Sequence, residues 1–421
     1  MSVFQMGVDC VAEVFSMKAS RSRDFCRLFV KLGLLQPLAL SFQNILAMYR
    51  ARQLTSTNTS LVIPPNTTAA IGGAIEESAE CKYALRMATL FFTFSRSDAI
   101  VAETMVKAEH CVLHVLLTAL QAPELRSSSS AGAGGRTPPS GVNQHSNKTE
   151  VIMDLLLKCL KNLSMEPSAL ADLEAAGTLE TLVPLLSGPM SDRYRNHILP
   201  CIFNMCRINK RRQERVAALG IIPHLKKVIT DNSPLRQFAL PILFDLAHTC
   251  DTTRRELGRW NCQAFFLDLL KENYWQAFAL NSLAVWLTSD PSSVVSLLIE
   301  PAHLAKLIEF FKSAHSQTIH TLHRPLLDMM LKSSELCKAL GKISLFTNIL
   351  IKRLRYTDEA IVLRSLLKML QLLYEFHENS KIWVESNNLI ALVEEFAKTE
   401  RKVLVRQLAR KLLIDFTQSD T

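Results

Sequence analysis

Residues 177–186 read Gly-Thr-Leu-Glu-Thr-Leu-Val-Pro-Leu-Leu, and residues 220–229 read Gly-Ile-Ile-Pro-His-Leu-Lys-Lys-Val-Ile. Each stretch starts at a glycine and carries apolar residues five and nine positions later. The arrangement occurs six times, from starting residues that lie 39 to 46 positions apart: Gly177, Gly220, Asn261, Ala302, Gly341 and Asn387. All twelve residues at the two offsets are apolar, which a non-repeating chain with 48% hydrophobic residues would seldom produce.

The length of this repeat predicts the fold. A period near 42 residues with helical spacing inside each repeat is typical of armadillo and HEAT repeats. We therefore expect an all-α protein, an armadillo/HEAT-type right-handed α-solenoid. The 421 residues exceed one ordinary core, but each solenoid repeat buries its apolar face against its neighbours. Only 13 glycines and 7% aromatic residues also argue against sheets.

Composition divides the chain into five segments. Residues 1–48 are expected to form an N-terminal helical repeat, and its abrupt start at Met1 indicates truncation. Residues 76–125 are expected to form another helical repeat. Residues 49–75 and 126–148 are expected linkers, the second disordered because it is rich in Ser, Gly and Pro. The regular armadillo-type array is expected over residues 149–421.

Two features inside each repeat are also predicted. The Gly or Asn that starts the repeated stretch suits a left-handed residue at the end of a helix. Ala302 is the exception, because it follows Pro301 and must turn another way. A short third helix, suggested by residues such as 233–237, favours armadillo over HEAT.

Cysteine usage and hydropathy indicate the compartment. Ten cysteines without a Cys-x-x-Cys pair indicate reduced, buried thiols, and neither disulfides nor a zinc site are expected. The first twenty residues do not read as a signal peptide, and no apolar run reaches the roughly 20 residues of a membrane span. We expect a soluble cytoplasmic protein with no cofactor, no metal and no small-molecule substrate.

Catalytic motifs are missing from the sequence. The Gly-rich residues 131–136 read as a linker, since no strand precedes them and no helix opens after them. No kinase His-Arg-Asp or Asp-Phe-Gly element occurs. We therefore expect a binding protein without catalytic residues. The net charge of +9 favours acidic protein partners, and a basic nucleic-acid-binding solenoid is an alternative.

Four polar residues are candidates for a partner-binding groove. They precede the loop to each turn, and such side chains can present donors and acceptors to an extended peptide at repeat spacing: Asn162, Asn204, Asp245 and Ser282. The alternative is that each caps or bridges neighbouring helices. Pro200 stands four residues before Asn204, where nuclear-import armadillo proteins carry tryptophan, which argues against binding of nuclear-localisation signals.

Six basic residues form a candidate docking patch for an acidic or phosphorylated segment: Lys210, Arg211, Arg212, Arg215, Lys226 and Lys227. The helix dipole also favours cations at the end of a helix, so structure alone could explain the first part of this run. Thr137, which precedes Pro138 in the expected linker, is a candidate site for a proline-directed kinase.

One block is specific enough to suggest a family. Residues 203–248 contain Ile-Asn-Lys-Arg-Arg-Gln-Glu and Gly-Ile-Ile-Pro-His-Leu. This block resembles the C-terminal armadillo-repeat region of the MAP kinase kinase kinase epsilon and septation-initiation (SepH-type) serine/threonine protein kinases. The resemblance continues at residues 24–27, 92–96, 274–275 and 279–285, so it covers most of the chain.

The resemblance implies a regulatory region of a signal-transduction kinase that acts in septation and cytokinesis. It implies protein partners bound along a concave groove, in the cytoplasm and at division or spindle-pole structures. The kinase domain of that family is absent from this sequence, so no catalytic residue is carried over. An alternative is a fragment of an active kinase whose catalytic domain is encoded upstream or missing from the gene sequence.

Overall fold

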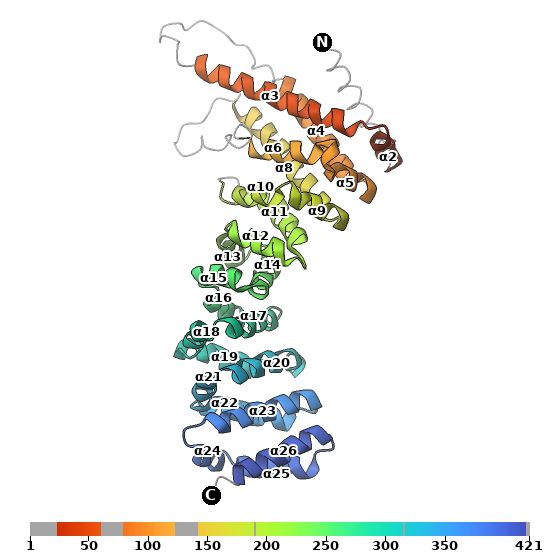
Figure 1. Cartoon of the computed structure of the whole chain (residues 1–421). Helices are drawn as coiled ribbons and strands as arrows, with labels where there is room; N and C mark the ends of the chain where they lie inside the picture. Colours follow the sequence, from red (N-terminus) through yellow and green to blue (C-terminus); the bar gives the residue numbers. More distant parts are fainter. Residues whose placement is uncertain (1–22, 60–78, 123–141, 189–190, 315, 418–421) are drawn as a thin grey trace. The chain divides into compact units, whose positions relative to one another are not determined.

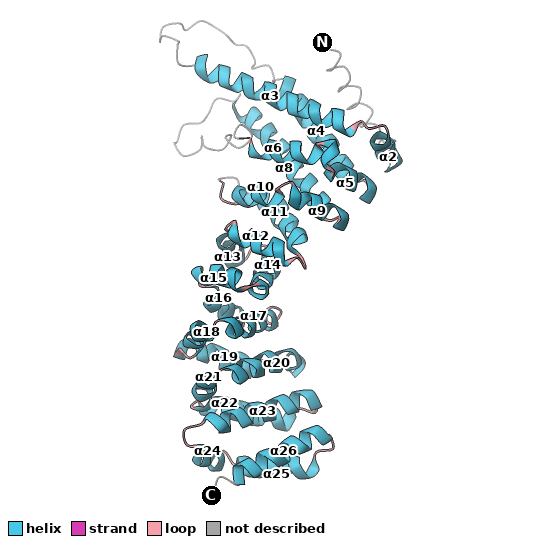
Figure 2. Cartoon of the chain, in the orientation of Figure 1, coloured by secondary structure: helices cyan, strands magenta, loops and turns pink. Residues whose placement is uncertain are grey.

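The computed structural model describes residues 23–59, 79–122, 142–188, 191–314 and 316–417. Within these ranges every regular element is a helix, and no strand occurs (Figure 2). The chain divides into two compact units, Met1–Ile242 and Leu243–Thr421. The path of the chain through both units is drawn in Figure 1.

The helices follow one another in groups of three: a short first helix, a second helix and a third helix. In the N-terminal unit the first two groups are α2 (Arg23–Lys31), α3 (Leu35–Thr59) and α4 (Ala79–Ser95), then α5 (Ala99–Val106), α6 (Val112–Gln121) and α8 (Val142–Ser164). The next two are α9 (Leu170–Ala175), α10 (Thr178–Leu185) and α11 (Ser191–Cys206), then α12 (Lys210–Ala218), α13 (Ile222–Thr230) and α14 (Arg236–Thr249). The 3-10 turns η2 (Ala108–His110) and η4 (Pro167–Ala169) precede α6 and α9.

The boundary between the two units lies within α14, and the C-terminal unit continues the pattern after that helix. Its four groups are α15 (Asp251–Arg259), α16 (Cys262–Leu269) and α17 (Gln276–Ser289); α18 (Pro291–Leu298), α19 (Pro301–Ser313) and α20 (Ser316–Lys332); α21 (Ser334–Gly341), α22 (Ser344–Tyr356) and α23 (Ala360–Phe376); and α24 (Ser380–Ser386), α25 (Leu389–Thr399) and α26 (Val403–Thr417).

Like helices of successive groups stack on one another. In the N-terminal unit the third helices pack in the order α4, α8 and α11. In the C-terminal unit the order is α17, α20, α23 and α26, and these helices lie along one side of the unit in Figure 1. The second helices α16, α19 and α22 stack in the same way. This is the arrangement of an armadillo-type α-solenoid, in which each repeat contacts only its neighbours.

The apolar residues of the repeated sequence form the core of the stack. Eleven of the twelve are buried, and Phe396 is half-buried. The buried ones are Leu182, Leu186, Leu225, Ile229, Phe266, Leu270, Leu307, Phe311, Phe346, Leu350 and Leu392. The repeated pattern therefore marks the side of each second helix that faces the core.

The corner between first and second helices has a left-handed residue in most repeats. Gly177, Gly220 and Asn261 have φ of +77°, +85° and +50°, as the sequence predicts. The prediction is wrong at Gly341, which is helical, and at Asn387, because the left-handed residue is Asn388. Ala302 is an exception in the structure as well. Pro301 is the first residue of α19, and the residue before it has an extended backbone instead of a left-handed one.

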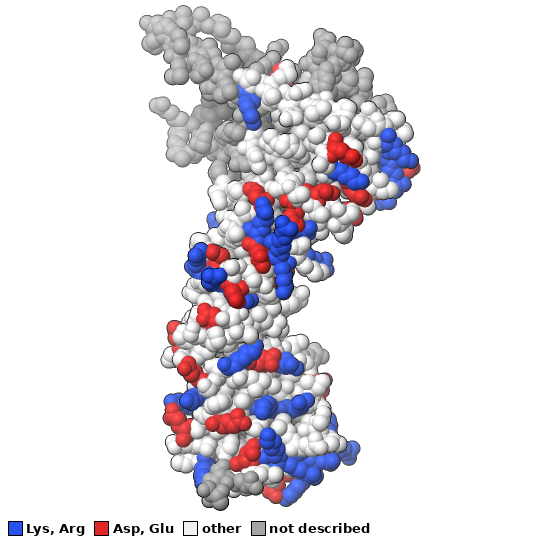
Figure 3. All heavy atoms as spheres, viewed as in Figure 1, with Lys and Arg blue, Asp and Glu red and all other residues white. Residues whose placement is uncertain are grey.

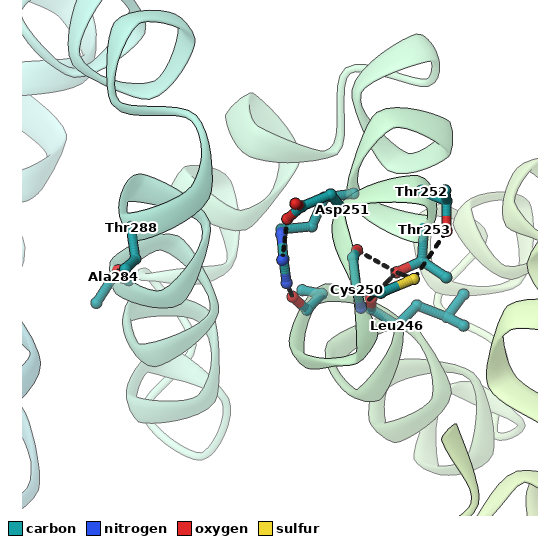
Figure 4. Close-up of polar contacts among 9 residues, drawn as sticks. Leu246, Cys250, Asp251, Thr252, Thr253, Ala284 and Thr288 are labelled. Carbon is teal, nitrogen blue, oxygen red and sulfur yellow. Dashed lines mark hydrogen bonds and ion pairs between the residues drawn. The ribbon is translucent and has the colours of Figure 1, made fainter. Parts of the chain in front are cut away.

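In three repeats, side chains at the start of the short first helix donate to the last carbonyls of the third helix before it. In α15, Thr253 Oγ1 donates to the Leu246 carbonyl and Arg254 Nη1 donates to the Ala247 carbonyl, both at 2.8 Å (Figure 4). The last carbonyls of a helix lack partners within it, so these side chains satisfy them. The same seven-residue spacing recurs in α12 and α21: Arg212 to Met205, Gln213 to Cys206 and Cys337 to Met330.

Three sequence predictions about element positions change. The short helix of each repeat is the first one, such as α12 or α15, whereas residues 233–237 hold a turn and the start of α14. Helix α3 continues to Thr59, past residue 49, and α8 begins at Val142, before residue 149. Extending an existing helix costs much less than starting one, which explains why it runs into polar sequence. The other segment boundaries stay predictions, and residues 60–78 and 123–141 lie outside the described ranges.

Among the described residues, no single helix is both long and apolar enough to cross a bilayer. The pair formed by α2 and the first part of α3, which meet at 87°, passes the criteria of length and composition only when taken together.

Candidate partner-binding surface

Asn162 and Asn204 connect adjacent third helices. Asn162 Nδ2 donates to Ser95 Oγ at 3.0 Å, and Asn204 Nδ2 donates to Ser164 Oγ at 3.0 Å. Both serines are buried, so each asparagine gives a buried hydroxyl a partner. At these two positions the structure has the alternative arrangement, in which the polar side chain bridges helices of the stack.

Ser282 corrects the predicted groove. Its side chain is fully buried, and its hydroxyl has no hydrogen-bond partner among the described residues. The reason is its position along the helix. Asn204 lies five residues before Asn209, the N-cap of the next helix, whereas Ser282 lies eight residues before the equivalent Asp290. The counterpart of Asn204 in α17 is therefore Val285.

Asp245 occupies the same place in α14, five residues before the N-cap Cys250. Its side chain is half-buried. Burial raises the pKa of the Asp245 carboxyl, and the nearby His248 partly opposes this shift. The four predicted groove residues thus have three different environments and do not form one exposed row.

Two of the six residues of the predicted basic patch, Arg212 and Arg215, form ion pairs between repeats. Arg212 is buried, and its guanidinium donates to the Glu174 carboxylate at 2.7 Å and to the Met205 carbonyl at 3.2 Å. Arg215 pairs with Glu180. Because the two glutamates belong to α9 and α10 and the arginines to α12, these contacts join consecutive repeats. Arg212 is not available to an external segment, so the prediction is corrected at that residue.

The rest of the basic patch is more open. Arg211 lies 3.6 Å from Glu174, with 84% of its side chain exposed. Lys210 and Lys227 are exposed, and Lys226 is half-buried. A docking role for these residues stays a prediction. Thr137 lies outside the described residues.

A different row of polar residues lies in the C-terminal unit. Its members, one on each of four successive third helices, are 43, 44 and 43 residues apart: Asn281, Arg324, Lys368 and Lys411. Two of the hydrogen bonds between third helices of this unit join residues that are 44 positions apart. Lys332 Nζ donates to Thr288 Oγ1, 44 residues away. Gln371 Nε2 and Asp415 Oδ2, also 44 residues apart, are separated by 3.5 Å. Residues at this spacing therefore lie beside one another on adjacent helices, and we call the four residues the third-helix row.

The basic members of the third-helix row have few competing partners. Arg324 has 75% of its side chain exposed and pairs with Asp328 of its own helix at 3.3 Å. Lys368 Nζ donates to the neutral Gln371 Oε1 at 3.0 Å. Lys411 is exposed and has no ion-pair partner within the described ranges. Among the described residues, Arg324 is thus the one cation of the row that is paired with an acidic side chain.

The helices that carry these cations have an excess of positive charge. Helices α20, α23 and α26 together hold seven Lys and Arg but only three Asp and Glu. Arg364, one turn before Lys368, is exposed and has no acidic partner among the described residues. In Figure 3, Lys and Arg side chains gather over the lower end of the C-terminal unit.

Aromatic side chains flank the asparagine end of the row. Tyr274 and Phe278 are 74% and 51% exposed. The Phe278 ring lies 5.9 Å from both the Trp275 and Phe244 rings, so its position is fixed by a packed cluster. Asn281, one turn after Phe278, is exposed, and its Nδ2 lies 3.4 Å from His248 Nε2. An apolar contact and an amide are thus available together on α17.

Sequence reasoning missed the third-helix row because its members are chemically mixed. A search for polar residues near the end of each third helix finds the bridging residues Asn162 and Asn204. It misses the row members, which lie one or two turns earlier in their helices. The usable signal is the spacing of 43 or 44 residues between polar positions on third helices. Among the described residues, no three His, Cys, Asp or Glu side chains are grouped as metal ligands.

Comparison with curated proteins identifies relatives along most of the chain. MAP3K epsilon protein kinase 2 of Arabidopsis thaliana is 32% identical over 83% of this chain and 24% of its own length. The cytokinesis protein sepH of Emericella nidulans is 28% identical over 99% of this chain and 27% of its own length. The chain is related to the MAP3K epsilon and SepH kinases. Cell division control protein 7 of Schizosaccharomyces pombe is 27% identical over 62% of this chain and 25% of its own length.

The chain spans about a quarter of the length of these kinase relatives. No protein-family profile matches it. The alignment with a limited part of each relative agrees with the predicted C-terminal, non-kinase region. The predicted relationship is therefore confirmed, and what the complete relatives do is not transferred to this chain by the likeness alone.

Solved structures with the same architecture confirm the predicted fold class. An engineered protein superposes with a TM-score of 0.53 over 99% of this chain and 95% of its own length, at 14% identity. A chain from a structure of the interaction between cadherin and beta-catenin gives 0.55 over 90% and 66%, at 13% identity. UNC-45 from Drosophila melanogaster gives 0.51 over 97% and 60%, at 13% identity. The chain is an all-α, armadillo-like solenoid.

Proposed function

We propose that this chain is a non-catalytic scaffold or regulatory region that binds proteins through its third helices. The observation that carries the proposal is the third-helix row. Its polar residues recur on four adjacent helices with few partners of their own, and all are exposed except the half-buried Lys368. A stack of repeats provides an extended surface of this kind, rather than a single enclosed pocket. No catalytic residue is assigned, since the predicted polar sites are bridges, caps and ion pairs.

The relatives give the proposal a setting. Two of them are named for cytokinesis or cell division, and others are named as MAP3K epsilon protein kinases. We place the chain in the same signalling context, in the cytoplasm and at division structures, where its partners are proteins of that pathway. This setting rests on similarity, while the choice of surface rests on exposure and spacing.

Site-specific photo-crosslinking in dividing cells tests this proposal with the full chain. A photo-reactive residue at Ile361, 71% exposed on the third helix α23, is expected to crosslink to other proteins. The same residue at Leu345, 46% exposed on the second helix α22, is the matched control. Equal crosslinking at the two positions, or crosslinking at Leu345 alone, would contradict a third-helix binding surface.

The kinase alternative has a direct test. Phosphotransfer from ATP to a generic protein substrate is expected to be absent for the purified chain, because its sequence has no nucleotide-binding or catalytic motif. Turnover that increases with the concentration of the purified chain would overturn the non-catalytic assignment.

A further inference from the structure

The charge of the third-helix row selects among protein partners. Arg324, Lys368 and Lys411 are successive members of the row; Arg324 and Lys411 are exposed and Lys368 is half-buried. Arg364 adds an exposed cation beside Lys368. The acidic residues on the same three helices are fewer. An anionic partner would therefore meet attraction along most of the row, and a basic partner would meet repulsion.

Helix packing sets the spacing that such a partner must match. Packed helices lie about 8–10 Å apart, so the three steps from α17 to α26 cover roughly 24–30 Å. An extended chain advances about 3.3 Å per residue, so about nine residues cross the four helices. Each helix thus meets about every third residue of the partner.

We propose that this surface binds an extended segment of another protein with a carboxylate side chain at about every third residue. Arg324, Lys368 and Lys411 each contact one Asp or Glu side chain, and Asn281 hydrogen-bonds to the backbone of the segment. This proposal rests on the proposed scaffold function and adds the chemistry and spacing of the partner.

The aromatic residues Tyr274 and Phe278 determine which end of the partner segment lies at α17. Tyr274 and Phe278 lie at the asparagine end of the row and remain largely exposed although they belong to a packed cluster. An apolar side chain of the partner would bury surface there, whereas no comparable aromatic pair is exposed on α23 or α26 within the described ranges. The end of the segment that meets α17 is therefore apolar.

Fluorescence anisotropy with synthetic peptides tests the proposal on the full chain. The probe is a labelled peptide with Leu-Ser-Ala at one end followed by three Glu-Ser-Ala units. Its binding is expected to weaken as salt rises, because exposed charges are screened. Two peptides serve as controls: one with Gln in place of every Glu, and one with the three Glu placed consecutively. Equal affinity for the Glu and Gln peptides would overturn an acidic partner, and equal affinity for the consecutive-Glu peptide would overturn the spacing.

Charge reversals locate the contact. Lys368→Glu and Lys411→Glu are each expected to raise the Kd about three- to tenfold, since each removes an attraction of the size seen in exposed ion pairs and adds repulsion. Lys352→Glu, at an exposed position on the second helix α22, is the matched control and should leave the Kd unchanged. Circular dichroism melting verifies that all three variants fold. A similar loss for Lys352→Glu would show that only net charge matters and would overturn the proposal.

Two further outcomes separate this inference from the function on which it rests. If a single-stranded RNA binds more tightly than the peptide and is lost with the same reversals, the acidic-protein assignment is overturned. If no peptide binds while Ile361 still crosslinks to proteins in cells, the partner chemistry is wrong but the scaffold function stands. If no peptide binds and Ile361 does not crosslink more than Leu345, both proposals fail.

Discussion

The side-chain amide of Asn204 donates a 3.0 Å hydrogen bond to the hydroxyl of Ser164, at the end of the preceding third helix. Ser164 is 2% exposed and donates in turn to the Lys161 carbonyl at 2.7 Å. Asn162 makes the same contact to Ser95 one repeat earlier. These two hydrogen bonds join α4 to α8 and α8 to α11. The two asparagines therefore stabilise the stack of helices.

Asn204→Ala is therefore expected to lower the free energy of unfolding by about 1 kcal/mol, because the buried Ser164 hydroxyl loses the amide that donates to it and keeps only its bond to the Lys161 carbonyl. Urea denaturation followed by circular dichroism measures the change. Asn281→Ala, at an exposed position, is the control and should change stability by less than about 0.5 kcal/mol. A neutral Asn204→Ala variant would contradict the bridging role.

Arg212 provides a second test of packing between repeats. Its buried guanidinium contacts both Glu174 and the Met205 carbonyl. Arg212→Ala is expected to cost about 2–3 kcal/mol, because Glu174 loses its cation and a helix-end carbonyl loses its donor. Arg211→Ala, at a position with 84% side-chain exposure, should stay within about 0.5 kcal/mol in the same denaturation experiment. Equal effects of the two substitutions would count against the structural assignment of Arg212.

Gly220 tests the left-handed corner. Its φ is +85°, and an added Cβ would meet no atom within 4 Å, so the backbone alone opposes a side chain. Gly220→Ala is expected to lower stability by about 1 kcal/mol. Gly220→Asn should recover part of that loss, since Asn261 and Asn388 adopt the same conformation in other repeats. Thermal melting of the two variants checks the order, and a less stable Asn variant would exclude the backbone explanation.

The sequence predicts the repeat and its core well, because both depend on apolar spacing that each repeat must satisfy. It predicts the left-handed conformation of Gly177 and Gly220 correctly, because glycine is the residue that most easily adopts this conformation at the end of a helix. It fails at Gly341, which lies in a helix where an added Cβ would come within 3.3 Å of the His377 ring. Glycine there avoids a crowded contact, which local sequence does not reveal.

The polar surface is harder to predict because partners come from other repeats. Arg211 and Arg212 are neighbours in sequence, yet one is exposed and the other is buried against Glu174. Asn204 and Ser282 look equivalent in sequence, but they stand at different distances from the next N-cap. The exposure of a residue in a solenoid depends on the register between helices. A difference of one residue in the length between two corners changes that register.

Asp245 gives a prediction about pH. Burial raises the pKa of its carboxyl in the folded chain, so the folded state holds this proton more strongly than the unfolded state. Its contribution to stability is therefore greatest at low pH and decreases as pH rises from the ordinary Asp range through the raised pKa. At neutral pH the charged Asp245 opposes folding.

Asp245→Asn removes this charge and is expected to increase stability at pH 7 by about 0.5 kcal/mol, a small amount because the side chain is only half-buried. The advantage should shrink as pH falls, because a growing fraction of the wild-type carboxyl is then protonated in the folded state. Urea denaturation at several pH values between 4 and 8 measures the difference. Asp358→Asn, in the exposed loop before α23, is the control and should show no such trend. If Asp245→Asn destabilises the chain at pH 7, the carboxylate is stabilised in the fold and the stated sign is wrong.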